Sequence, residues 1–297
     1  MGSYRDGCAC GWWRCLVLGY KTASRIRDAA CAEFVLPNLI MGNQMTDPAK
    51  SISIFFLLTF VWSWSCWLLA PVVQAESNYA SSALFFLGGF GPSLAAIAVV
   101  CLYGGRTGLR TWLLRCLTWR GSSGWLVLAF LSPPAGLAVA AGAHMPLGSS
   151  VPPSPAIAHV GLFVANIFLI FLVGAPLGEE LGWRSASLAL GIILGLLHLP
   201  LFYVADSTQN NGSMAAFFVL IVATSVFYTW LYNRNNGSVL PALTLHTASN
   251  SWPFLVPVLP SNTEQRPYLF VVALVVTTAI WLLIRRDDRF PHKGRPS

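Results

Sequence analysis

Long apolar stretches, separated by short polar, proline-rich or glycine-rich breaks, make up most of the chain. A helix needs about 20 apolar residues to cross the hydrocarbon core of a bilayer. The pattern therefore predicts an all-α, polytopic membrane helix bundle of about eight transmembrane helices. The expected spans are Ser51 to Pro71, Ser82 to Tyr103, Gly124 to Met145, Ala156 to Glu180, Ala186 to Val204, Met214 to Tyr232, Ser238 to Pro257 and Pro267 to Ile284.

Basic residues fall in the breaks on one side of this pattern. Positive charge collects on the cytosolic side of membrane proteins, so we expect a multi-pass protein of the cell membrane with both termini in the cytosol. We divide the chain into a cytosolic arm at 1–49, expected to be disordered, a membrane domain at 50–285 and a basic tail at 286–297. The basic positions are Arg106, Arg110, Arg115, Arg120, Arg234, Arg285, Arg286, Arg289, Lys293 and Arg295.

Composition supports lipid as the solvent. Of the 297 residues, 55% are hydrophobic and 10% are charged, and the mean hydropathy is +0.62, outside the usual range of soluble domains. The net charge of +7 would suit nucleic acid, but no basic face or RNA-binding motif accompanies it, so no nucleic-acid partner is expected. The seven cysteines, all at or before Cys116, lack metal-site spacing and are interpreted as free thiols or lipidation sites.

Two acidic residues lie at the end of an apolar stretch, where an ionisable group costs on the order of 2.5–3.5 kcal/mol. These are Glu179 and Glu180, and Arg184 follows Glu180 by four positions, so this pair shares one helix face. Glu179 points about 100° away and is available to another partner. A simpler interpretation is that all three residues end a helix at the cytosolic interface.

Two histidines and an asparagine also lie in apolar stretches. His246 and Asn250 are four residues apart, on one helix face. His198 by itself is more typical of a packing histidine bonded to a backbone carbonyl. His144 and His159 lie near the outer ends of their spans and are interpreted as interfacial.

Carboxylates, imidazoles and an amide together suit hydrolysis of a peptide bond. A desolvated carboxylate can take a proton from water, with imidazole relaying it. Histidine and asparagine can donate hydrogen bonds to the oxyanion of the tetrahedral intermediate.

At these residues the sequence resembles the CPBP family, the intramembrane peptidases related to the type II CAAX prenyl endopeptidase. The family pattern is Glu-Glu-x-x-x-Arg, Phe-x-x-x-His and His-x-x-x-Asn on three helices. The first motif is present as Glu179, Glu180 and Arg184, and the third as His246 and Asn250. The second has His198, with Leu194 in place of phenylalanine.

The resemblance implies a membrane endopeptidase whose substrate is a membrane-embedded or lipidated protein or peptide. It implies that Glu180 and His198, assisted by Glu179, activate water, while His246 and Asn250 stabilise the oxyanion. The family has been described both as metallopeptidases and as metal-free glutamate peptidases. The sequence slightly favours the metal-free form; a zinc ion, if used, would be held by Glu180, His198 and His246.

One departure from the family concerns the connection between the first two motifs. Only thirteen residues, 185–197, separate Arg184 from His198, and one straight helix would hold Glu180 and His198 about 27 Å apart. We therefore predict a tight helical hairpin that turns near Leu188 to Gly191, with Gly191 helping the turn. The alternatives are a catalytically inactive scaffold or immunity-type homologue, and a transporter that uses these residues as a proton path.

Overall fold

The computed structural model describes residues 48–119, 121–147, 158–173, 187–205, 207–235, 238–256, 258 and 266–284. Within these ranges the chain forms helices and no β-strand, which confirms the predicted all-α class. The α-helices are α3 (Pro48–Gln74), α4 (Asn78–Gly89), α5 (Gly91–Leu117), α6 (Ser123–His144), α7 (Ala158–Val173), α9 (Ser187–Leu197), α10 (Met214–Arg234), α11 (Leu240–Ser251) and α12 (Arg266–Ile284). Short 3-10 turns are η2 (Met145–Leu147), η3 (Leu199–Tyr203) and η4 (Trp252–Phe254).

By length and composition, five of the described helices are long and apolar enough to cross a membrane, namely most of α3, α5, α6, α10 and α12, and the stretch in α5 includes a bend at Gly105. Two shorter apolar helical segments, at His159–Phe171 and Leu190–Tyr203, accompany them. Large apolar side chains face outward, with Leu57 63% exposed and Val72 69% exposed. Lipid covers such a surface without cost, so these helices point to a membrane protein. The count of eight spans stays a prediction.

Helices α3 and α4 form an antiparallel pair joined by a short turn in which the Ser77 side chain caps α4. The second predicted span, Ser82 to Tyr103, is divided at Phe90 into α4 and the start of α5. Small residues bring these backbones close to α3. The Ser63 hydroxyl donates to the Gly88 carbonyl at 2.8 Å, and a Cβ at Gly91 would collide with the same hydroxyl. This approach resembles the small-residue packing of membrane helices.

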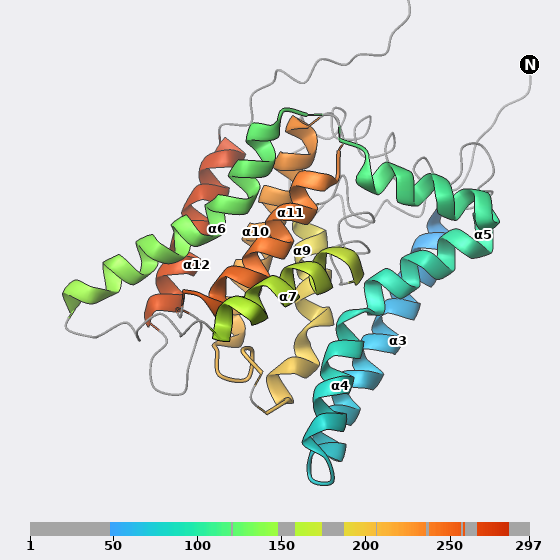
Figure 1. The fold of residues 1–297 in the computed structure, drawn as a ribbon, viewed down its shortest axis with the longest axis horizontal. Coiled ribbons are helices and arrows are strands. Elements are labelled where there is room, and N and C mark those ends of the chain that lie inside the picture. Colours follow the sequence, from blue (N-terminus) through green and yellow to red (C-terminus); the bar gives the residue numbers. More distant parts are fainter. Residues whose placement is uncertain are drawn as a thin grey trace, which may run out of the picture.

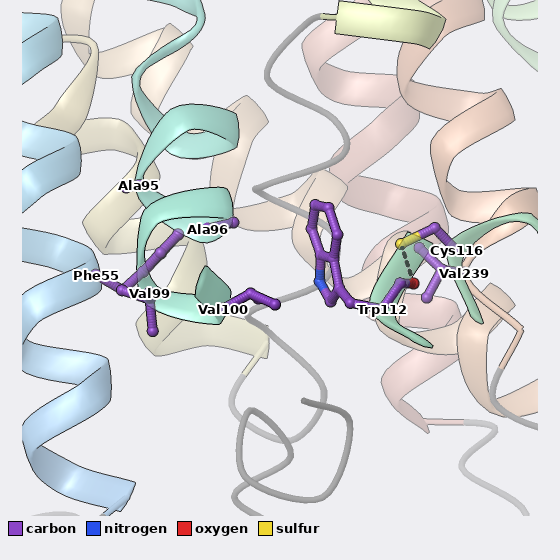
Figure 2. Packing of buried hydrophobic residues seen from close by; sticks show 8 residues of the cluster. All are labelled: Phe55, Ala95, Ala96, Val99, Val100, Trp112, Cys116 and Val239. Atoms are coloured by element: carbon purple, nitrogen blue, oxygen red, sulfur yellow. Dashed lines mark hydrogen bonds between the residues drawn. The ribbon is translucent and has the colours of Figure 1, made fainter. Parts of the chain in front are cut away.

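Helix α5 bends sharply at Gly105, where φ is +57° and ψ is −156°. In Figure 1 its first part rises beside α3 and its second part crosses one end of the bundle. Figure 2 shows Trp112 of the second part between Val100 of the first part and Val239 just before α11. The Trp112 side chain is 2% exposed, so this cluster joins α3 and α5 to the start of α11.

Helices α9 and α10 pack antiparallel through two glycines. A Cβ at Gly191 would lie 2.6 Å from Cα of Val222, and one at Gly195 would lie 2.6 Å from Cε1 of Phe218. The predicted hairpin turn at Leu188 to Gly191 is wrong, because these residues are inside the continuous helix α9. Gly191 permits close helix packing and makes no turn there.

The chain reverses direction earlier, between α7 and α9. Phe163 of α7 contacts Trp252 just after α11, whereas Phe171 of α7 borders Leu240 at the start of α11. Helix α7 is therefore antiparallel to α11. Helix α11 is antiparallel to α10, which is antiparallel to α9, so α7 and α9 run in opposite directions (Figure 1).

Basic residues gather at one end of the bundle. The start of α3 with Lys50, the second part of α5 with Arg106 and Arg110, and the end of α10 with Arg234 all lie at the end where Trp112 and Val239 meet (Figure 1). The opposite end holds Glu76, in the turn between α3 and α4, and also the basic residue Arg266, at the start of α12 (Figure 1). This distribution agrees with the charge asymmetry of the sequence, and the cytosolic location of the basic end stays a prediction.

Candidate functional site

Helix α11 carries two of the predicted site residues, His246 and Asn250. It begins with Pro241 in its first turn, a position that tolerates proline because the missing N–H has no partner within the helix. It packs against α6, α7 and α10. His246 is half-buried and Asn250 is exposed. The two residues are one helical turn apart on the same face, as the sequence predicts, and their joint action on a bound group stays a prediction.

The ring of His246 lies against α10. Its centroid is 5.6 Å from that of Tyr228, and the two rings are stacked at 14°. Tyr228 itself packs with the cluster formed by Ala129, Leu231 and Leu245. The stack therefore fixes the plane of the imidazole against a helix that is anchored on both sides.

Asn166 of α7 holds the other end of α11. Its side-chain Nδ2 donates to the backbone carbonyl of Asn250 at 3.2 Å and to Oγ of Ser251 at 3.0 Å. Sequence reasoning missed this residue, although the signal was present as a lone amide in the apolar run Ala158–Val173. Amide groups in such runs commonly join neighbouring membrane helices, so Asn166 positions the end of α11 that carries Asn250.

His198 lies between the end of α9 and η3. Its Nδ1 is 2.7 Å from the carbonyl oxygen of Leu194. Because a carbonyl can only accept, Nδ1 carries the proton, and in the neutral ring Nε2 keeps a lone pair that can take a proton. The ring is flanked by Trp67 at 5.7 Å and Phe217 at 5.6 Å. The carbonyl bond is the one expected of a packing histidine, and it leaves Nε2 able to act as a base.

The two histidines contact the same helix, α10, at different levels. His198 lies against Phe217 and His246 lies against Tyr228, which is eleven residues further along α10, a rise of about 16 Å. Asn250 lies one turn below His246, about 6 Å nearer the level of His198. A catalytic group that serves both histidines must therefore bridge this offset.

The predicted carboxylates and their arginine, Glu179, Glu180 and Arg184, lie outside the described residues. Their place relative to the histidines stays a prediction. The division of the chain into an arm at 1–49 and a tail at 286–297 also stays a prediction. Residues 1–47 of the arm and the whole tail lie outside the described residues.

The positions of His198 and His246 give little support to a zinc site formed by these two histidines and Glu180. No three His, Cys, Asp or Glu residues within the described ranges lie together in a way that could hold a metal ion. Ligand nitrogens bind zinc at about 2.0–2.1 Å, so two imidazoles on one ion must nearly touch. The offset between His198 and His246 along α10 does not fit that requirement.

An apolar groove of about 510 Å³ lies beside α11, with Phe130 of α6 and Phe171 of α7 among its walls. Thr244 of α11 also lines it, and its hydroxyl donates to the Leu240 carbonyl at 2.8 Å. The threonine is thus satisfied within its own helix. The groove can receive a hydrocarbon chain, and it lies on a different side of α11 from the His246 ring, because positions 244 and 246 point about 200° apart.

Comparison with known proteins gives one informative similarity. No protein-family model matches the chain. The chain is 30% identical over 135 residues to a protein of Methanococcus maripaludis named CAAX prenyl protease 2. The match covers 38% of this chain and 49% of that protein, so the chain spans about half the length of the relative. The similarity supports a likeness to CAAX proteases and identifies no catalytic residue in this chain.

Proposed function

We propose that this chain is a membrane endopeptidase that hydrolyses a peptide bond at or within the bilayer, in the manner of CAAX prenyl endopeptidases. The observation that carries the proposal is the face of α11 with His246 and Asn250, held by Tyr228 on one side and by Asn166 on the other. The partial similarity to a protein named CAAX prenyl protease 2 supports the same class.

The proposed chemistry uses water as the nucleophile. Glu180, assisted by Glu179 and His198, removes a proton from a water molecule while the oxygen of that water attacks the peptide carbonyl carbon. His246 and Asn250 donate hydrogen bonds to the oxyanion that forms, which is worth most where water is scarce. The proton held by the base then passes to the leaving amine as the C–N bond breaks. Arg184, four residues after Glu180, lowers the cost of placing that carboxylate at membrane depth.

The proposed substrate is a membrane-embedded or lipidated protein or peptide, cleaved near its C-terminus. The apolar groove beside α11 supports this choice, because the space between Phe130 and Phe171 could hold a lipid chain next to the helix that carries His246 and Asn250, although on another side of that helix. The proposed location is the cell membrane, with both termini in the cytosol.

A second candidate function is a catalytically inactive scaffold or immunity-type protein that binds a partner within the bilayer. The observation that favours it is the axial offset of about 16 Å between the ring contacts of His198 and His246 on α10. The short connection of thirteen residues between Arg184 and His198 favours it as well.

A reconstituted cleavage assay separates the two candidates. The full-length protein is placed in liposomes with a library of membrane-anchored reporter peptides, each offered with and without a lipid chain. We expect cleavage of lipidated reporters, abolished by Glu180→Ala and reduced about 10²–10³-fold by His246→Ala or Asn250→Ala, as for removal of one oxyanion donor. His159→Ala, at the start of α7, is the histidine control outside the three motifs.

The same assay tests the remaining parts of the proposal. His198→Ala should lower the cleavage rate by about 10²-fold if its Nε2 assists the base, and an unchanged rate removes His198 from the site. Inhibition by a chelator would show metal dependence and overturn the metal-free form of the mechanism. If the wild type cleaves no reporter and its cellular effect is unchanged in Glu180→Ala, the peptidase proposal is wrong and the scaffold is favoured.

A further inference from the structure

The second part of α5, residues 106–117, has features of a helix that lies along a membrane surface. It follows the bend at Gly105, whose positive φ strongly favours glycine. In Figure 1 it crosses the end of the bundle where the basic residues gather. We call it the basic half-helix.

One face of the basic half-helix is buried against the protein. Gly108, Trp112 and Cys116 recur every four residues and are all buried. Trp112 packs against both parts of α5 and against Val239 (Figure 2). The connection after the half-helix is tied to the same region, since the Ser238 hydroxyl donates to the Thr118 carbonyl at 3.0 Å. This face is therefore fixed, and the opposite face cannot turn inward.

The opposite face combines positive charge with large apolar side chains. Arg106, Arg110, Leu113 and Leu117 follow one another at spacings of four, three and four residues, so they share one side of the helix. Both arginines are exposed, Leu113 is 42% exposed and Leu117 is 59% exposed. Water disfavours the leucines and the hydrocarbon core disfavours the arginines. The interface between water and the hydrocarbon core suits both kinds of side chain, because the arginines can reach toward the lipid headgroups there.

The charge of this face is not balanced by a nearby carboxylate of the described chain. Within the described ranges, Glu76 is the single acidic residue, and it lies beyond the far end of α3, a helix of 27 residues. A guanidinium binds phosphate oxygens through two parallel N–H donors, and its charge suits an anionic headgroup.

We propose that the basic half-helix lies in the membrane interface and that Arg106 and Arg110 bind the phosphate groups of anionic phospholipids. The leucines on the same face indicate that the bound phosphate belongs to a lipid, because a soluble phosphate ion would leave these leucines in water. The proposal is independent of whether the chain cleaves peptides.

Native mass spectrometry of the full-length protein tests this directly. The protein is extracted from bilayers of mixed phosphatidylcholine and phosphatidylglycerol, and the lipids that stay bound are counted. We expect wild type to retain phosphatidylglycerol selectively, and Arg106→Gln and Arg110→Gln each to weaken that selectivity about fivefold, the size expected for one basic side chain at an anionic surface. Arg234→Gln is the matched control, an exposed arginine at the same end but outside the half-helix.

Two further arms complete the test. The Arg106→Lys, Arg110→Lys double variant keeps the charge and should keep most of the selectivity, losing only the part due to the paired donors. Inorganic phosphate, added to lipid-free protein in detergent, should not raise the thermal unfolding midpoint as phosphatidylglycerol does. Equal retention of the two lipids by wild type, equal loss in Arg234→Gln, or an equal shift with inorganic phosphate would overturn the proposal.

Discussion

The surroundings of His198 and His246 differ in the kind of contact that holds each histidine. His198 lies between two aromatic rings, beside a cluster that includes Trp67 and Leu194, and its hydrogen bond stays within its own helix end. His246 stacks on Tyr228, and its helix is tied to α7 by side-chain hydrogen bonds from Asn166. Ring packing and a bond within its own helix end thus explain the position of His198, whereas α11 is also tied to another helix by the side-chain hydrogen bonds of Asn166. The apolar region should govern stability and the polar region activity.

The largest expected effect concerns Trp67, in the region of His198. Trp67 is 4% exposed, and its indole donates to the Phe85 carbonyl at 2.9 Å. Trp67→Ala should lower the free energy of unfolding by about 3–5 kcal/mol, because it leaves a cavity beside His198. Titration of the protein in mild detergent with a denaturing detergent measures this free energy of unfolding.

Trp62 provides the matched control for Trp67. It is on the same helix and donates to the Leu87 carbonyl at 2.8 Å, but it is 42% exposed. Trp62→Ala should cost about 1 kcal/mol, the value of the lost hydrogen bond. Equal losses in the two variants would mean that burial around His198 contributes little to stability.

A smaller effect is expected from Gly191, where α9 meets α10. Gly191→Ala should destabilise the protein by about 1–3 kcal/mol, because the new Cβ would lie 2.6 Å from Cα of Val222. Gly161→Ala in α7 is the control, since nothing lies within 4 Å of its added Cβ. That control should be neutral or stabilising by up to about 1 kcal/mol. The same unfolding titration applies, and a stabilised Gly191→Ala variant would disprove the close packing.

The smallest effect on stability, about 0.6–1.7 kcal/mol, is expected from Asn166→Leu in the region of His246. Ser251→Ala removes one of the two hydrogen bonds that Asn166 donates, so the double variant should lose less than the sum of the two single losses. The cleavage rate should fall more in Asn166→Leu than in Gly191→Ala, although its stability falls less. A larger fall of the cleavage rate in Gly191→Ala would show that the regions of His198 and His246 do not divide stability and activity in this way.

Much of the fold could be predicted from apolar run lengths, since each predicted span overlaps a described helix. The break at Phe90 was not foreseen, because the apolar run continues through it. Gly191 was predicted to turn the chain, whereas the structure uses it for contact with Val222. A glycine in a sequence indicates either role, and only the neighbouring helix decides between them.

The sequence by itself determined that the chain is helical and apolar and that His246 and Asn250 share one helix face. These properties depend on hydrophobicity and on the 3.6-residue helical period, which are local. The tertiary structure decided which helices are neighbours. It placed His198 and His246 at different levels of α10, brought Asn166 to the end of α11 and laid the basic half-helix across the bundle. Helix packing depends on small side chains and bends far apart in the chain, so no single stretch of sequence specifies it.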